Sequence, residues 1–111
     1  MQDMEIWTIL LQLLHKCELE VLIMKVAKFG GSSLADANQI RKVCDIILSD
    51  KDRRLIVVSA PGKRSKEDIK VTDLLIALAE KYYKDGKADA ELDAVINRFD
   101  DIVKGLELSS D

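Results

Sequence analysis

A lysine, two glycines and two serines stand together in the segment Lys28-Phe29-Gly30-Gly31-Ser32-Ser33, between an apolar run and a helical pattern. Because glycine has no Cβ, Gly30 and Gly31 allow the backbone to approach an anion closely, and free N–H groups at the start of the next helix point toward it. Lys28, expected as the last strand residue, adds a positive charge, and the serines add hydroxyl donors. This order is typical of a phosphate-binding loop; a Gly-Gly turn beside a surface lysine is the alternative.

Two apolar runs on either side of a helical pattern predict a strand–helix–strand unit. The first run covers residues 21–27 and is broken only by Lys25, and the second, residues 55–58, is typical of a strand buried on both faces. Between them, apolar residues recur at helical spacing at Ile40, Val43, Cys44, Ile47 and Leu48. With a capping box formed by Ser33 and Asp36, this spacing predicts a helix over residues 34–49.

The connection between the two predicted strands determines where their polar ends lie. A crossover of this length makes the strands parallel, so their carboxyl ends open on the same edge of the sheet. Ligands bind at that edge in open α/β sheets. We therefore expect residues 28–32 and residues 59–62 to converge there.

The segment from Ala60 to Lys70 contains a Pro-Gly turn and many charges, which predict a solvated, mobile loop. Its basic residues Lys63, Arg64, Lys66 and Lys70 are alternative phosphate contacts. Gly62-Lys63 does not fit the P-loop motif, since Val57 and Arg64 occupy positions where that motif has glycine and Ser or Thr. Helices are predicted from Val71 to Tyr82 and over residues 89–105. Thr72, at the start of the first, is expected as a cap, a ligand contact or both.

Composition restricts the function classes. The chain has 111 residues and a net charge of −3, so it is one domain or part of one and lacks the basic excess of a nucleic-acid-binding protein. A single histidine, His15, excludes a histidine-rich metal site within this chain. Cys17 and Cys44 lie in helical patterns and are predicted to be buried thiols in a reducing, cytoplasmic compartment, with no metal-ligand spacing. The apolar run of residues 6–14 is too short to cross a membrane.

The segment Lys-Phe-Gly-Gly-Ser-Ser resembles the N-terminal signature of aspartokinases, within the amino-acid kinase superfamily. Residues 57–60 and 71–75 resemble two further landmarks of that family. The resemblance begins at Met24, so residues 1–23 are predicted to be a helical N-terminal extension and residues 24–111 the N-terminal part of an amino-acid kinase domain. It implies the α/β class, with a parallel βαβ sheet and helices on both faces.

The resemblance also implies a reaction, which is ATP-dependent phosphorylation of the side-chain carboxylate of L-aspartate to aspartyl phosphate, in the biosynthesis of lysine and related amino acids. ATP would act with Mg²⁺. Lys28 is similar to the catalytic family lysine that contacts the ATP phosphates, Gly30, Gly31 and Ser32 match the phosphate-facing loop, and Ser59 and Thr72 match positions that hold aspartate. A homo-oligomer is expected, with neither nucleic acid nor membrane as a partner.

Two alternatives remain open at this point. One is an enzyme of the same fold that acts on another carboxylate, carbamate or phosphate, although the double serine after Gly-Gly argues against it. The other is a non-catalytic fragment, or a subunit whose N-terminal helix joins a partner. In the family, the groups that complete the aspartate site and the adenine site lie beyond the positions matched here. We therefore expect the 111 residues alone to be inactive, with at best weak anion binding at residues 28–32.

Overall fold

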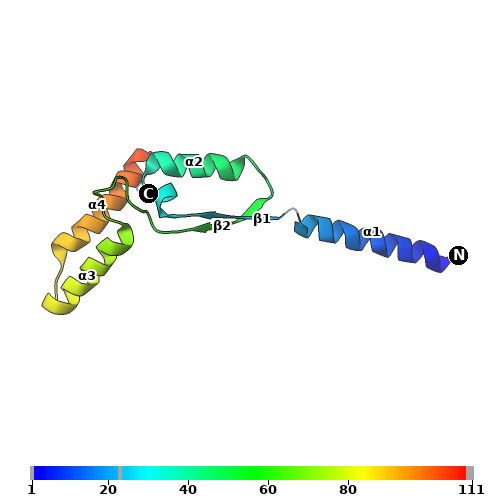
Figure 1. Ribbon diagram of the computed structural model, residues 1–111, viewed down its shortest axis with the longest axis horizontal. Coiled ribbons are helices and arrows are strands. Elements are labelled where there is room, and N and C mark those ends of the chain that lie inside the picture. The colour runs from blue at the N-terminus through cyan, green and yellow to red at the C-terminus, as the bar shows by residue number, and fades with distance from the viewer. Residues whose placement is uncertain (1, 23, 110–111) are drawn as a thin grey trace.

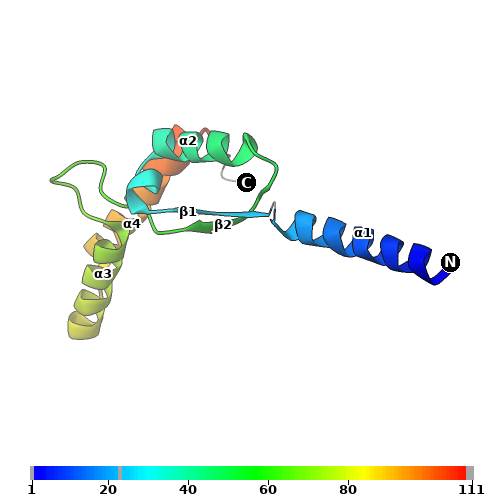
Figure 2. The ribbon, with the colours of Figure 1, turned by 45° about the vertical axis from the view of Figure 1, so that its right-hand side comes forward.

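A computed structural model of the protein describes residues 2–22 and 24–109. The elements follow one another in the order α1 (Gln2–Leu22), β1 (Lys25–Phe29), a 3₁₀ turn η1 (Gly31–Leu34), α2 (Ala37–Leu48), β2 (Arg53–Val58), α3 (Val71–Asp85) and α4 (Asp89–Gly105). The molecule is elongated, with extents of 80 × 32 × 31 Å. Helix α1 extends away from the other elements, and α3 and α4 lie at the opposite end (Figure 1; Figure 2).

Strands β1 and β2 form a two-stranded parallel sheet. Their register pairs Val26 with Leu55, Lys28 with Val57 and Phe29 with Val58, so both strands end at the same level. Helix α2 makes the connection between them, which confirms the predicted βαβ unit. The polar segments that follow the two strands therefore start side by side, as the sequence predicted.

Helix α2 covers one face of this sheet, as Figure 1 shows. The core consists of the buried Phe29, Leu34 and Val43, against which Ala27, Ile40, Ile47 and Ile56 pack. Alternation along the strands places Val26, Leu55 and Val57 on the opposite face, where each is exposed. The mixed α/β class with a parallel sheet is confirmed, and in the described part of the chain one face has a helical layer while the other presents apolar side chains.

The start of α2 differs from the sequence prediction. Residues 31–34 form a 3₁₀ turn in which the Ser33 N–H donates to the Gly30 carbonyl at 3.1 Å, so Ser33 is not the helix cap. The N-cap is Asp36, whose carboxylate accepts a hydrogen bond from the Gln39 N–H at 2.9 Å. The prediction of a Ser33 capping box was wrong because the chain makes a tighter turn first and the α-helix begins only at residue 37.

Helices α3 and α4 form a hairpin at the carboxyl edge of the sheet. Both predicted helices are confirmed, and α3 continues beyond Tyr82 to Asp85. Gly86 ends α3 in the left-handed conformation, at φ 72°, and its N–H donates to the Tyr82 carbonyl. At the far end of the hairpin, Arg41 Nη2 donates to the Gly105 carbonyl at 2.5 Å. A Cβ on Gly105 would lie 2.6 Å from that of Ala37, so α4 packs closely against the start of α2.

The thiol of Cys44 is exposed, so the prediction that it is buried was wrong. Ile40, Val43 and Ile47 take the positions of α2 that face the sheet, and Cys44 is rotated about 100° from Val43 around the helix. The side chain of Cys17 lies outside the described part of the structure.

Among residues 2–22 and 24–109, none of the helices combines the length and apolar character that a membrane crossing requires. The described residues contain no group of three or more His, Cys, Asp and Glu placed to hold a metal ion.

Candidate functional site

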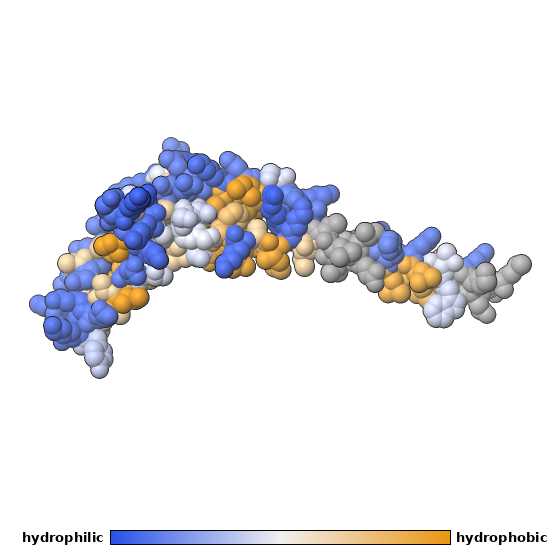
Figure 3. All heavy atoms as spheres, in the orientation of Figure 1, coloured by the Kyte–Doolittle hydropathy of each residue, from blue (hydrophilic) through white to orange (hydrophobic). Residues whose placement is uncertain are grey.

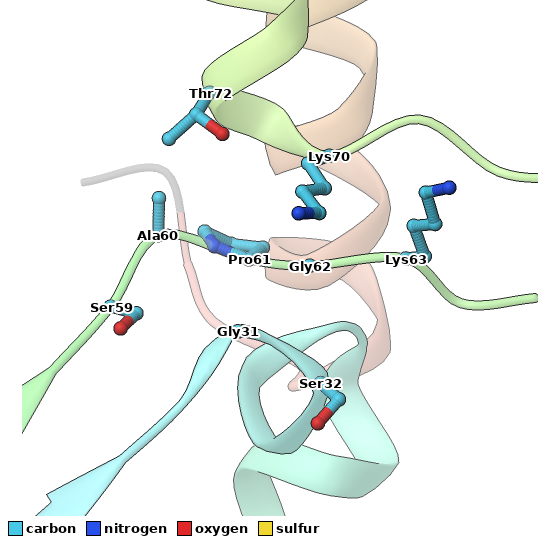
Figure 4. A pocket seen from close by; sticks show the side chains of 9 residues that line it. All are labelled: Gly31, Ser32, Ser59, Ala60, Pro61, Gly62, Lys63, Lys70 and Thr72. Atoms are coloured by element: carbon cyan, nitrogen blue, oxygen red, sulfur yellow. The ribbon is translucent and has the colours of Figure 1, made fainter.

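A pocket of about 420 Å³ opens at the carboxyl edge of the sheet, between η1, the segment after β2 and the start of α3 (Figure 4). It is lined by Gly31, Ser32, Ser59, Ala60, Pro61, Gly62, Lys63, Lys70 and Thr72. Glycines, hydroxyls and two lysines therefore surround one open space. These described lining residues include no carboxylate, so the pocket is suited to an anion.

Backbone hydrogen bonds join the three segments that form the pocket. The Ser59 N–H donates to the Phe29 carbonyl at 3.1 Å, which continues the strand pairing past the end of the sheet. The Gly62 N–H then donates to the Gly31 carbonyl at 2.7 Å, and the Val71 N–H donates to the Pro61 carbonyl at 3.0 Å. The pocket wall is therefore fixed by main-chain contacts on either side of Gly62.

The segments that contain Gly31 and Gly62 cross so closely that Gly62 has no room for a Cβ. A Cβ on Gly62 would lie 2.6 Å from the Gly31 carbonyl carbon and 2.9 Å from the Ser32 nitrogen. A Cβ on Gly31 would lie 3.1 Å from the Ala60 carbonyl oxygen. The sequence predicted close approach of the Gly-Gly backbone to an anion, whereas the structure shows that Gly31 approaches another backbone segment. A Cβ on Gly30 would have none of the described residues within 4 Å, its chain neighbours aside.

The structure brings four of the six predicted site residues together, namely Gly31, Ser32, Ser59 and Thr72. Lys28 and Gly30 are not among the lining residues. Phe29, and not Lys28, is the last residue of β1, so that detail of the prediction was wrong by one position. Because Phe29 is buried under α2, Lys28 lies on the opposite, uncovered face, where it is exposed.

The basic residues of the loop after β2 divide into two groups. Lys63 and Lys70 line the pocket, and in Figure 4 Lys70 and Thr72 project from the start of α3 toward the Ala60-Pro61-Gly62 segment. Arg64 instead binds Asp68 through its main-chain N–H, at 2.9 Å, and its side chain, at 2.7 and 3.0 Å. These hydrogen bonds hold the pKa of Asp68 well below its usual range and raise the pKa of Arg64. Lys63, Arg64 and Lys66 are exposed, which confirms the predicted solvation of this loop.

Thr72 is the second residue of α3 and does not cap the helix. The N-cap is Lys70, which makes no side-chain capping hydrogen bond. The interpretation of Thr72 as a helix cap was therefore wrong. Thr72 lines the pocket, so a ligand contact is the interpretation that remains.

Sequence reasoning underestimated two residues that shape the pocket and missed a third. Gly62 was expected at the edge of the sheet, but its need to be glycine was not recognised, and Lys70 was named only as an alternative phosphate contact in a solvated loop. Arg98 was not identified at all, although it is buried and its Nη2 donates to the Gly62 carbonyl at 2.5 Å and to the Ala35 carbonyl at 3.0 Å. The Pro-Gly dipeptide was the available signal for Gly62; nothing local marked Arg98.

Residues 24–104 match the sequence model of the amino acid kinase family, which covers most of the chain together with the site described above. The chain belongs to this family.

Within the family, the similar proteins are aspartokinases, as the residues predicted. Aspartokinase 3 of Bacillus subtilis is 54% identical over 85 residues, which are 77% of this chain and 19% of that protein. The crystal structure of Clostridium acetobutylicum aspartate kinase superposes with a TM-score of 0.73 at 44% identity, over 78% of this chain and 20% of that one. Escherichia coli aspartokinase III in complex with aspartate and ADP gives a TM-score of 0.57 at 39% identity, over 71% and 16%. The chain spans one fifth or less of the length of these relatives.

Proposed function

We propose that this chain forms the phosphate- and aspartate-binding edge of an aspartokinase, which phosphorylates the side-chain carboxylate of L-aspartate with ATP. The observation that carries the proposal is the gathering of Gly31, Ser32, Ser59 and Thr72 around one pocket with two lysines. The aspartate and ADP complex of the similar Escherichia coli enzyme supports the choice of ligands.

The residues present suit this chemistry. The substrate carboxylate has a reference pKa of about 3.9, so it is ionised at neutral pH and needs no general base. The difficulty is to bring it to an anionic phosphate and to stabilise charge on the transferring group, which is achieved by positioning and electrostatics. In our proposal Lys63, Lys70 and backbone N–H groups near Ser32 neutralise and orient the phosphates, while Ser59 and Thr72 hold the aspartate. Lys28 would contact the phosphates as the catalytic lysine.

Mg²⁺ fits this site only as a companion of the nucleotide. The described lining residues supply hydroxyls and ammonium groups but no carboxylate, which is the usual protein ligand of Mg²⁺. We therefore propose that the ion arrives bound to the ATP phosphates. A cytoplasmic location, a place in lysine biosynthesis and a homo-oligomeric state belong to the same proposal.

Two measurements test the proposal. In the 111-residue chain, titration with ADP should shift the amide resonances of Gly31 and Ser32, and titration with L-aspartate should shift those of Ser59 and Thr72. For turnover, residues 24–104 can replace the matching segment of Bacillus subtilis aspartokinase 3, and aspartyl phosphate is then trapped with hydroxylamine. The proposal would be refuted if the chimera folds but is inactive and if neither ADP nor L-aspartate shifts these amide resonances in the 111-residue chain.

Variants of the chimera assign the roles. Lys28→Met should reduce turnover about 100-fold or more, the scale for losing a charge partner of the transition state. Alanine at Ser59 or Thr72 should raise the KM for aspartate by the equivalent of about 1–2 kcal/mol and leave the KM for ATP nearly unchanged. Turnover of the Lys28 variant within a few-fold of the parent, or an effect of the alanines on ATP alone, would show that the roles are wrongly assigned.

A second candidate function, protein interaction through α1, is favoured by one observation. The helix exposes apolar side chains, including Trp7, Leu11 and Leu14. Figure 3 shows a hydrophobic patch on the visible side of this helix. Exposed apolar patches of this kind mark interaction surfaces. Light scattering on the chain with and without residues 1–23 decides between the two candidates. Loss of an oligomer together with absence of ADP binding would favour the interaction protein.

A further inference from the structure

We propose that Arg98 is a positioning residue for the phosphate pocket, which it serves by fixing the peptide group between Gly62 and Lys63. Arg98 lies in α4, 36 residues from Gly62 and 63 from Ala35 along the chain, and it does not line the pocket. The part of this inference that concerns a phosphate ligand rests on the proposed function. The part that concerns the loop conformation does not.

One nitrogen of Arg98 joins the two segments that cross at the pocket. Its Nη2 donates to the carbonyl of Gly62, after β2, and to the carbonyl of Ala35, directly after η1. Gly62 is therefore held on both sides, because its N–H also donates to the Gly31 carbonyl at 2.7 Å. The Gly62 and Ala35 carbonyls cannot shift without breaking a hydrogen bond to the buried, charged Arg98. Such charge-assisted bonds are about twice as strong as neutral ones.

The orientation of one peptide group follows from this contact. The described residues contain no cis peptide bond, and in a trans peptide the C=O and N–H point in opposite directions. Since the Gly62 carbonyl points at Arg98, the Lys63 N–H points away from it. Lys63 lines the pocket, so we infer that this N–H is a donor to an anion bound there.

The energetic cost of Arg98 argues against a role in stability alone. The residue is 4% exposed, and its Nε and Nη1 atoms are buried with no hydrogen-bond partner among the described residues. The carboxylate of Asp68 is 3.6 Å from Nη2 and already binds Arg64. Burial, reinforced by the charge of Arg64, accordingly lowers the pKa of Arg98. The hydrogen bonds that Arg98 makes to described residues go to the Gly62 and Ala35 carbonyls, so these two contacts are what offsets the cost of burying the arginine.

Two smaller cavities beside Arg98 do not offer a better site. They have volumes of about 210 and 100 Å³, and Arg64, Arg98 and Asp101 line both of them. Asp68 also lines the larger cavity and Asp36 the smaller one. These carboxylates would repel an anion, whereas the described lining of the pocket on the other side of Gly62 has none. The guanidinium therefore acts through the Gly62 carbonyl and not as a direct ligand.

The test uses Arg98→Met and Arg98→Lys in the complete 111-residue chain. Amide hydrogen exchange is measured at Gly62, which reports the crossing, and at Val43, which lies in the core of α2. ADP is the probe for binding. Arg98→Met should accelerate exchange at Gly62 about 10-fold or more relative to Val43, and weaken ADP binding by a similar factor, as expected for loss of charge-assisted hydrogen bonds. Arg98→Lys, with a less suitable geometry for two carbonyls, should give an intermediate result.

Arg41→Met is the matched control. Like Arg98, Arg41 is an arginine that donates to a backbone carbonyl, in its case that of Gly105 in α4 at 2.5 Å. Unlike the Gly62 carbonyl bound by Arg98, that of Gly105 belongs to a residue that does not line the pocket. Its loss should leave the Gly62-to-Val43 exchange ratio and ADP binding within about twofold of the parent, since exposed side-chain contacts change little beyond their own surroundings.

Each outcome supports or overturns the inference. Equal acceleration of exchange at Gly62 and Val43 would show that Arg98 stabilises the whole chain, which would overturn the inference. Unchanged ADP binding in a variant whose Gly62 amide exchanges faster would also overturn it. If Arg98→Met does not fold, the exchange ratio in Arg98→Lys decides. If the parent chain binds no ADP, the proposed function fails, while the exchange ratio still supports or refutes the positioning of Gly62.

Discussion

Replacing Gly62 with alanine would add a methyl group at the point where the two pocket segments cross. The new Cβ would lie 2.6 Å from the Gly31 carbonyl carbon and 2.9 Å from both the Gly31 oxygen and the Ser32 nitrogen. Ordinary contacts between carbon atoms are about 3.5–4.0 Å, so the segments must separate by about 1 Å. All three neighbours are backbone atoms, and no side chain can rotate away to relieve the contact.

The magnitude follows from three contributions. Overpacking of this kind costs about 1–3 kcal/mol. Separation of the segments also weakens the 2.7 Å hydrogen bond from Gly62 to Gly31, which contributes about 1 kcal/mol. The smaller conformational freedom of alanine in the unfolded chain offsets about 0.4–1 kcal/mol. The free energy of unfolding should therefore fall by about 1–3 kcal/mol, with about 4–8 °C of melting temperature for each kcal/mol.

Gly30→Ala is the control, because it adds the same methyl group directly beside Gly31 but away from the crossing. A Cβ on Gly30 would have no atom within 4 Å, and the backbone angles there are extended, at φ −77° and ψ 175°. Alanine at this position should leave stability unchanged or raise it by up to about 1 kcal/mol. Urea unfolding followed by circular dichroism measures both variants. Gly62→Ala as stable as the parent, or a loss of stability in Gly30→Ala as large as in Gly62→Ala, would refute the reasoning.

Three further predictions concern single residues. Asp36→Ala should lower the free energy of unfolding by about 1 kcal/mol through loss of the cap on α2, and Asp36→Asn should restore most of it. The pKa of Asp68 is lower in the folded chain than in the unfolded one, so its stabilisation is complete above about pH 4 and is lost as the pH falls further; Asp68→Asn should flatten that acid limb in pH-dependent unfolding. Cys44 should react with iodoacetamide in the native chain, and protection until unfolding would contradict its exposure.

The pattern of apolar residues predicted the order of strands and helices, but not the burial of the second strand, where Leu55, Val57 and Val58 are exposed. Phe29 and Val43 are buried where the strand and helix spacing requires, and the two strands pair in parallel around α2. The error at the start of α2 arose where two polar residues compete to cap one helix. Ser33 and Asp36 are both good caps, and only the 3₁₀ turn that contains Ser33 shows which is used.

The candidate site was predictable where its chemistry is local and unpredictable where it depends on crossing segments. Gly31 and Ser32 could be found because they directly follow a predicted strand, at the edge of the sheet where ligands bind. Gly62 could not be assigned its role, because the need for glycine comes from Gly31, which lies in a different loop. Arg98 is more remote still, since its link to the pocket is a hydrogen bond formed across 36 residues.

Lys28 shows how the fold constrains a residue that the sequence predicted to be a phosphate contact. Phe29 must point toward α2 because it belongs to the core, and alternation along β1 then directs Lys28 to the uncovered face of the sheet. Lys63 and Lys70 approach from the loop and the start of α3. If Lys28 contacts the nucleotide as proposed, it does so from a different side than these two lysines. Cations on separate sides can neutralise separate phosphates, which is what transfer between two anions requires.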